Sequence, residues 1–296
     1  MEKFYGTGVA LVTPFKDEGA VDYKALEAIV EYQIDNGIDY LVVLGTTAES
    51  VTLTKEEKQQ VIKTVSLVNA GRLPLVVGVG GNNTLALVEE LKHTDFLDYD
   101  AILSVSPAYS KPTQEGIYQH FRALSVASPL PIVLYNVPSR TGSNMLPETT
   151  LRLANDFDNI IGIKEACADT VQLDTILKNK PADFHLISGD DFTALATVLA
   201  GGSGVISVLG QGLPNQFSKM IALALKGDSE PAYEFHQSLL NGMHLIFEEG
   251  NPAGIKTIFE VLGFMKANVR LPLVSASPDL KSRIADFMKA FQQVMV

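Results

Sequence analysis

The chain of 296 residues is 46% hydrophobic and 19% charged, which is typical of a folded globular protein and excludes the intrinsically disordered class. Its net charge is −11 and its lysines and arginines form no block, so we expect neither nucleic acid nor an anionic membrane as a partner. No apolar run has the length of a membrane helix, the amino-terminal segment lacks a signal core, and Cys167 is the only cysteine, so we expect a cytoplasmic protein.

Short runs rich in β-branched residues recur along the whole chain. They are continuously apolar rather than alternating in polarity, which is typical of parallel strands that are covered on both faces. The eight predicted strands are residues 8–12, 40–44, 75–79, 101–105, 132–135, 160–164, 184–188 and 204–208.

Helical patterns fill the intervals between these strands. Residues 22–36 and 54–69, for example, carry apolar side chains at helical spacing, with Asp22 and Thr54 as the expected N-caps. Eight strands that alternate with helices predict a (β/α)8 barrel, also called a TIM barrel, which occupies residues 1–228 and carries the active site.

The chain continues beyond the eighth strand and its helix. Three further helical patterns exceed what a barrel needs, and we expect them to form a C-terminal helical region over residues 229–296. They cover residues 230–250, 252–265 and 278–296. A doubly wound sheet is the alternative fold, but glycine-rich residues 78–83 lack the last glycine of a dinucleotide fingerprint and residues 201–204 lack the Walker lysine.

Lys164 ends the sixth predicted strand, directly after four apolar or small residues. A dry environment disfavours the ammonium form, and the resulting free amine attacks a carbonyl carbon to form an imine. The alternative is a lysine whose stem is buried and whose ammonium reaches water. Both interpretations place the amine at the carboxyl end of a strand.

Polar residues follow other predicted strands at the same end, where barrels of this kind build their active sites. Thr46 and Thr47 follow the second strand, and their hydroxyl and backbone N–H groups are suited to a carboxylate. Tyr135 ends the fifth strand and Arg140 follows it. A plain turn, a core tyrosine and a solvated arginine are the alternatives, but convergence with Lys164 on one rim favours a site.

A metal-dependent site is the competing hypothesis. The five histidines show no His-x-x-x-His spacing, and one cysteine excludes a Cys-x-x-Cys pair. Asp190 and Asp191 are adjacent and would suit Mg²⁺, although such carboxylates more often cap a helix. We therefore expect lysine chemistry with no metal and no cofactor.

Three segments, in this order and spacing, resemble one known superfamily. They are Gly45-Thr46-Thr47-Ala48-Glu49-Ser50, Tyr135-Asn136-Val137-Pro138-Ser139-Arg140-Thr141-Gly142 and Ile163-Lys164-Glu165-Ala166. The chain is similar over nearly its whole length to the dihydrodipicolinate synthase and N-acetylneuraminate lyase superfamily of pyruvate-dependent lysine aldolases, and Arg140 resembles the dihydrodipicolinate synthase branch. Ala48 stands where the family usually has glycine, and its methyl group requires a negative φ.

The resemblance implies an activity and a set of partners. The small-molecule substrates are pyruvate and aspartate semialdehyde, which condense in the first committed step of diaminopimelate and lysine synthesis. A sibling aldolase, such as a sialic-acid or sugar-acid lyase, and a barrel that only binds a keto acid remain the alternatives. The family also implies self-association to a homodimer or homotetramer.

The resemblance further implies the role of each site residue. Lys164 forms the imine with pyruvate, and Tyr135 relays protons together with Thr46 and the partner's Tyr109. Thr47 helps to hold the pyruvate carboxylate. Two more residues are implied as substrate contacts, namely Arg140 for the second substrate's carboxylate and Ile206 through its backbone carbonyl.

Feedback by lysine is the last property that the resemblance addresses. Relatives inhibited by lysine carry two histidines, a glutamate and a tyrosine at four positions that differ here, while two further positions match. The differing residues are Lys55, Lys58, Ala86 and Ala108, and the matching ones are Ser50 and Asn82. We expect feedback to be weak or absent, because lysine's ammonium finds neither the carboxylate nor the aromatic ring.

Overall fold

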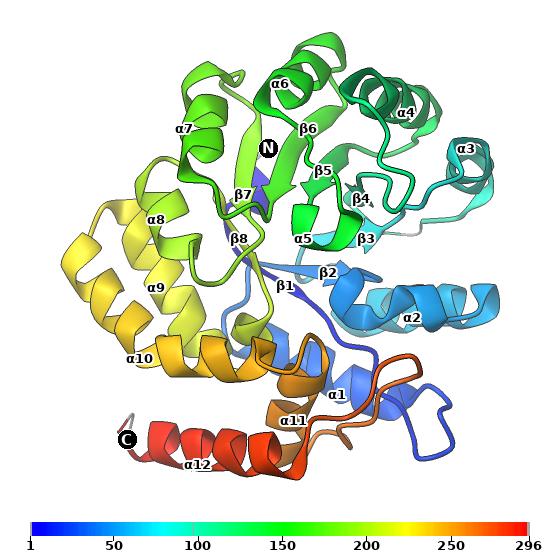
Figure 1. Ribbon diagram of the computed structural model, residues 1–296. Coiled ribbons are helices and arrows are strands. Elements are labelled where there is room, and N and C mark those ends of the chain that lie inside the picture. Colours follow the sequence, from blue (N-terminus) through cyan, green and yellow to red (C-terminus); the bar gives the residue numbers. More distant parts are fainter. Residues whose placement is uncertain (1, 97, 295–296) are drawn as a thin grey trace.

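Eight parallel strands form a closed barrel in the computed structural model, which describes residues 2–96 and 98–294 (Figure 1). Each strand pairs with the next along the chain, and β8 pairs with β1. The strands are β1 (Gly6–Ala10), β2 (Tyr40–Val43), β3 (Leu75–Gly78), β4 (Ala101–Val105), β5 (Ile132–Asn136), β6 (Ile160–Glu165), β7 (His185–Ser188) and β8 (Gly204–Ser207). The (β/α)8 prediction is confirmed.

Helices alternate with the strands and surround them in Figure 1. The longer ones are α1 (Tyr23–Asp35), α2 (Lys55–Asn69), α3 (Thr84–His93), α4 (Gln114–Ala127), α6 (Pro147–Asp156), α7 (Thr170–Asn179), α8 (Ala194–Leu199) and α9 (Pro214–Lys226). Short helical turns are η1 (Glu2–Phe4), η2 (Thr46–Ala48), η3 (Ser50–Thr52), α5 (Pro138–Thr141) and η4 (Leu209–Gln211). Turns η2 and η3 follow β2, α5 follows β5 and η4 follows β8, all at the carboxyl ends of the strands, where the site lies.

The predicted N-caps are confirmed. Asp22 accepts a hydrogen bond from the backbone N–H of Ala25 at 3.2 Å. Thr54 accepts one from the N–H of Glu57, whose carboxylate in turn accepts from the N–H of Thr54. These reciprocal bonds satisfy N–H groups that the first turn of α2 leaves without a helical partner.

The first strand was predicted two residues too late. It begins at Gly6, where φ is +97°, and pairs with β8 through Gly6 and Gly204. Gly6 at the start of the strand carries little strand signal, since glycine has no side chain to pack against a neighbour. Closure of the barrel brings β8 beside Gly6 and Thr7, and pairing with β8 makes these two residues part of the sheet.

The apolar residues form two layers. Inward-facing side chains fill the barrel, with Tyr40, Val42, Leu103, Val133 and Tyr135 among them. A larger core lies between the strands and the helices and continues into the C-terminal region. Because successive residues of a strand point to opposite sides, each strand contributes to both layers.

Three helices follow residue 228, as predicted. They are α10 (Ser229–Phe247), α11 (Ala253–Val261) and α12 (Pro278–Val294), and α10 packs along α9 at the lower side of Figure 1. The second ends four residues before its predicted end, because Gly263 adopts a left-handed φ of +81° and stops the helix. The last two residues of the third predicted helix lie outside the described residues.

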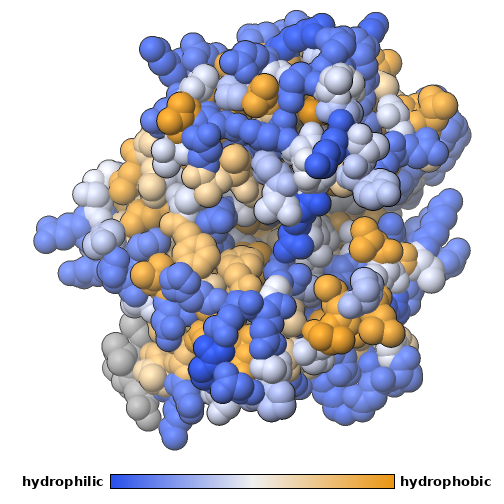
Figure 2. Space-filling model, in the orientation of Figure 1, coloured by the Kyte–Doolittle hydropathy of each residue, from blue (hydrophilic) through white to orange (hydrophobic). Residues whose placement is uncertain are grey.

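Hydrophilic side chains cover most of the face shown in Figure 2, with hydrophobic residues in separate patches. Over residues 2–96 and 98–294, no helix is both long and apolar enough to cross a membrane.

Gly204→Ala should destabilise the protein more than Gly201→Ala. Both residues have a positive φ, but a Cβ at Gly204 would lie 1.9 Å from the carbonyl oxygen of Gly6, whereas a Cβ at Gly201 meets nothing within 4 Å. We expect backbone strain to cost about 1–3 kcal/mol in each variant and the clash to cost about 1–3 kcal/mol more in Gly204→Ala. Urea denaturation measures both values, and equal losses would contradict the close contact.

Candidate active site

Lys164 and Tyr135 lie side by side inside the carboxyl end of the barrel. The two residues are in register across β5 and β6, and the Nζ atom of Lys164 lies 4.6 Å from the centroid of the Tyr135 ring. Only 5% of Lys164 is exposed. The amine is therefore enclosed next to a phenol, which is the arrangement that imine chemistry with a proton relay requires.

Gly189, the residue after β7, leaves room for the lysine stem. A Cβ at Gly189 would lie 3.0 Å from both Cγ and Cε of Lys164 and 2.8 Å from Cβ of Ala166. A side chain at this position would displace the stem. The glycine therefore keeps the space that directs the amine toward the cavity.

A cavity of about 270 Å³ opens at this point, and the structure brings five of the seven predicted site residues to its wall. They are Thr46, Thr47, Tyr135, Arg140 and Lys164. They come from the ends of β5 and β6 and from turns η2 and α5. The cavity has the size of a site for small metabolites and combines a nucleophile, hydroxyl groups and a guanidinium.

The other two predicted residues do not line this cavity. Ile206 is buried in the barrel interior with Tyr135, while Val208 lines the cavity at the end of β8. Tyr109 is 93% exposed on the loop between β4 and α4. The resemblance assigns Tyr109 to the site of a partner subunit, and this single chain leaves that role a prediction.

Ala48 fits its loop as the sequence required. It lies in turn η2 and is not among the residues with a positive φ, so its methyl group is tolerated. The residue after it, Glu49, takes the left-handed conformation instead, with a φ of 53°.

The C-terminal region contributes to the cavity, which the sequence did not predict. Phe247 and Asn251 line it, and the Nδ2 atom of Asn251 donates a hydrogen bond to Oγ1 of Thr47 at 2.9 Å. Thr47 and Asn251 are 204 positions apart. No local pattern marks Asn251, so only the folded chain identifies it.

Glu165 supports the site from the outer face of β6. Its carboxylate accepts hydrogen bonds from Nδ2 of Asn136 at 2.9 and 3.0 Å and from Nε2 of Gln172 at 2.9 Å. Asn136 also accepts a bond from the N–H of Met145 at 3.0 Å. Asn136 and Met145 flank the loop that carries Arg140, so this buried cluster fixes both ends of the loop.

Asp190 and Asp191 cap backbone N–H groups. Asp190 accepts from the N–H of Phe192 at 2.8 Å, and Asp191 accepts from the N–H of Leu209 at 2.7 Å. Burial raises the pKa of Asp191 to about 6. These N–H groups belong to the turn before α8 and to the start of η4, whereas the N-cap of α8 is Thr193, without a side-chain hydrogen bond. Among the described residues, no three His, Cys, Asp or Glu side chains gather in a way that would hold a metal ion.

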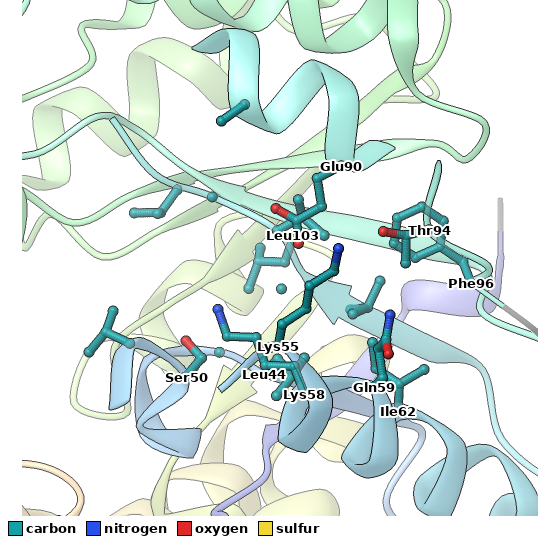
Figure 3. Close-up of a pocket in the computed structure, with 18 of the residues that line it drawn as sticks. Leu44, Ser50, Lys55, Lys58, Gln59, Ile62, Glu90, Thr94, Phe96 and Leu103 are labelled. Atoms are coloured by element: carbon teal, nitrogen blue, oxygen red, sulfur yellow. The ribbon is translucent and has the colours of Figure 1, made fainter. Parts of the chain in front are cut away.

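A second cavity of about 740 Å³ lies between α2 and α3 and reaches Thr46 and Tyr135 of the first (Figure 3). Lys55 and Lys58 project from α2 toward it, and Glu90 of α3 lies on the opposite wall. In the part of the chain that the structure describes, neither ammonium group forms an ion pair. Four of the six residues that the family associates with lysine feedback share this cavity, namely Ser50, Lys55, Lys58 and Ala86.

Comparison with known proteins gives the family. The model of the dihydrodipicolinate synthetase family matches residues 3–291. The chain belongs to this family. The 4-hydroxy-tetrahydrodipicolinate synthase of Flavobacterium psychrophilum is 59% identical over 289 residues, which cover 98% of this chain and 99% of that relative.

Solved structures of family members have the same fold. The dihydrodipicolinate synthase of Acinetobacter baumannii, complexed with pyruvate, matches with a TM-score of 0.93 and 37% identity over 97% of this chain and 99% of that one. The enzyme of Cyanidioschyzon merolae, with lysine bound, matches with a TM-score of 0.94 and 36% identity over 98% of both chains.

The stability of the protein should depend on the protonation of Glu165. Burial raises the pKa of this carboxyl from 4.5 to about 7, against the hydrogen bonds that lower it. The folded state binds this proton more tightly than the unfolded state does. Protonation of Glu165 therefore contributes fully to the free energy of unfolding below pH 4.5, and this contribution is lost as the pH rises through 7. The loss amounts to about 3 kcal/mol.

Urea denaturation between pH 5 and 8 tests this dependence. The difference in the free energy of unfolding between the wild type and Glu165→Gln should change by about 3 kcal/mol between pH 5 and pH 8, because glutamine does not titrate. Parallel pH profiles for the two proteins would contradict it.

Proposed function

We propose that the protein condenses pyruvate with L-aspartate 4-semialdehyde to 4-hydroxy-tetrahydrodipicolinate, the reaction of a lyase in diaminopimelate and lysine synthesis, through an imine on Lys164. The observation that carries the proposal is the enclosed amine of Lys164 beside Tyr135, in one cavity with two threonines and an arginine. The names of the relatives support the same reaction. A cytoplasmic location, where both substrates are metabolites, is part of the proposal.

The chemistry needs only the side chains of the site. The amine of Lys164 adds to the keto carbon of pyruvate, and loss of water leaves an iminium. The iminium accepts the electron pair released when the methyl group loses a proton, and the resulting enamine attacks the aldehyde carbon, whose oxygen takes up a proton and becomes the hydroxyl group. The amino group of the semialdehyde then adds to the iminium carbon and displaces the amine of Lys164, which closes the ring and frees the enzyme. No metal and no cofactor is required, because the iminium is the electron sink.

The surrounding residues bind the substrates and move protons. Thr46 and Thr47 offer hydroxyl groups to the pyruvate carboxylate, and turn η2 adds backbone N–H groups. The phenol of Tyr135, next to the amine, carries protons to and from the keto oxygen as it leaves as water. Arg140 lies at the mouth of the site, where its guanidinium suits the carboxylate of the semialdehyde.

An exposed aromatic residue in a strained backbone supports the proposal of a second subunit. Tyr109 has a φ of 63°, and its loop is held by two hydrogen bonds, from the N–H of Ala108 to Asn82 and from the N–H of Tyr109 to the carbonyl oxygen of Thr141. The bond to Asn82 brings this loop beside the start of α3. Leu85 of α3 is 77% exposed there. We propose that this surface is the interface of a homodimer, or of the dimers in a homotetramer, and that Tyr109 reaches the partner's site.

Lys164→Ala and Lys164→Arg should each lower kcat by more than about 10³-fold while the fold persists. Alanine removes the nucleophile, and a guanidinium stays protonated and does not add to a carbonyl. Reduction with borohydride in the presence of pyruvate, followed by mass spectrometry, should show an adduct on Lys164 of the wild type and of the control Lys178→Ala.

The same experiment separates the remaining possibilities. Absence of an adduct on Lys164 would refute the imine. Turnover of N-acetylmannosamine with pyruvate but not of aspartate semialdehyde, in a panel of aldehydes, would assign the site to a sibling aldolase.

Mixing two inactive variants should restore activity if Tyr109 acts in the partner's site. A heterodimer of Lys164→Ala and Tyr109→Phe subunits contains one site with both Lys164 and the partner's Tyr109. Random assortment puts about a quarter of all sites in this complete form. We therefore expect about a quarter of wild-type activity after the two variants are unfolded together and refolded, with each variant refolded alone as the control. No recovery, or an active monomer in sedimentation, would contradict the shared site.

L-Lysine should not inhibit this protein at concentrations that inhibit lysine-regulated relatives. The cavity in Figure 3 presents Lys55 and Lys58 where those relatives have histidines, and Ala86 where they have a glutamate. Two cationic groups repel the ammonium of lysine, and the carboxylate is missing at position 86; the acidic groups of this cavity, Glu89 and Glu90, stand about one helical turn farther along α3. Steady-state assays with added lysine should show less than about a twofold change in rate, and cooperative inhibition would contradict the expectation.

A further inference from the structure

A buried ion pair lies directly behind the carboxylate-binding turn. Glu49 follows η2, and its side chain is 1% exposed. Its Oε1 atom lies 2.6 Å from Nζ of Lys256, whose side chain is 0% exposed. Its Oε2 atom accepts a hydrogen bond from the backbone N–H of Arg270 at 2.9 Å. Both partners of Glu49 belong to the C-terminal region, so this contact joins that region to the site.

Glu49 is tied to the turn by its backbone as well. Its N–H donates to the carbonyl oxygen of Thr46 at 3.0 Å, and its carbonyl accepts from the N–H of Thr52 at 2.9 Å. The residue has the left-handed φ of 53°, which only a fixed environment stabilises in a non-glycine residue. Movement of the Glu49 side chain therefore moves the turn that carries Thr46 and Thr47.

Lys256 is held from three sides. It lies on α11, donates a hydrogen bond to the carbonyl oxygen of Asn268 at 2.8 Å, and has the ring of Phe15 at 4.1 Å from Nζ. Burial lowers the pKa of Lys256 to about 8, although the carboxylate of Glu49 acts to raise it. The ammonium has no alternative partner in water, so its position determines where the Glu49 carboxylate lies.

Two further residues of the C-terminal region hold the same segment. Asn251 donates to Oγ1 of Thr47, and the guanidinium of Arg270 donates to the carbonyl oxygen of Thr52 at 2.8 Å and to both carboxylate oxygens of Glu57. Residues 47–57 thus contact the C-terminal region at four places.

A buried ion pair is a poor source of stability, because the cost of removing two charges from water nearly cancels their attraction. An apolar pair of similar volume is often as stable. We therefore explain the pair by what it positions, and the element of the site that Glu49 contacts through its backbone is the turn with Thr46 and Thr47.

We propose that Glu49 and Lys256 are positioning residues, through which the C-terminal helical region sets the hydroxyl groups of Thr46 and Thr47 for the carboxylate of the keto-acid substrate. The inference rests on the proposed function for the identity of that substrate. Neither residue lines the cavity, so both act through the turn.

Three variants and a control test the proposal. They are Lys256→Met, Glu49→Gln, the double variant Glu49→Gln/Lys256→Met, and the control Lys281→Met. The control removes the half-exposed pair of Lys281 with Glu260 in the same region, 2.9 Å between Nζ and Oε2, which does not contact the turn. The single variants leave a buried group without its partner, whereas the double variant removes both charges.

The expected result separates positioning from stability. Melting temperature should fall in both single variants and recover at least in part in the double variant. The KM for pyruvate should rise about tenfold or more in all three, with kcat at saturating pyruvate within about threefold and the KM for the semialdehyde unchanged. Lys281→Met should show the wild-type KM. A double variant with the wild-type KM for pyruvate would overturn the proposal.

Hydrogen exchange measures the turn without any turnover, so it tests the positioning even if the proposed function is wrong. Residues 45–53 should exchange faster in the double variant than in the wild type and in Lys281→Met. Unchanged exchange in this segment would refute the positioning role. Absence of a pyruvate adduct on wild-type Lys164, by contrast, would refute the function alone.

Discussion

The register between β5 and β6 is the constraint on which the site depends. Tyr135 pairs with Lys164, and Asn136 pairs with Glu165. Because neighbouring residues of a strand point to opposite sides, one register places the phenol and the amine together inside the barrel and the amide and the carboxylate together outside it. A shift of one residue would pair Tyr135 with Glu165 or with Ile163, separate the phenol from the amine, and release the loop of Arg140 from its anchor.

Buried carboxylates hold the segments around the cavity. Glu49 lies behind the turn of Thr46 and Thr47, Glu165 lies behind the loop of Arg140, and Asp191 accepts the N–H groups of Val208 and Leu209 after β8. Each is at most 2% exposed. Burial of an acidic group costs free energy that hydrogen bonds only partly offset. The three positions lie behind three of the segments that line the cavity, so stability is exchanged here for a fixed site.

The site was predictable where residue type and strand position carried the signal. A lysine at the end of an apolar run and a tyrosine at the end of the previous strand are visible in the sequence, and the barrel places both on one rim. The role of Tyr109 came from family resemblance alone, and in the single chain this residue faces outward. Asn251 was missed, because its contact with Thr47 spans 204 positions and leaves no periodic trace.

The sequence by itself determined the order and type of the elements, the helix caps and the rim position of Lys164. These features depend on side-chain periodicity and on hydrogen bonds within a few residues of one another, which a linear chain already contains. Only the tertiary structure decided that β1 begins at Gly6, that Glu49 pairs with Lys256, and that Phe247 at the end of α10 and Asn251 after it line the cavity. Those contacts join distant segments, and they exist only after the barrel closes and the C-terminal helices pack against it.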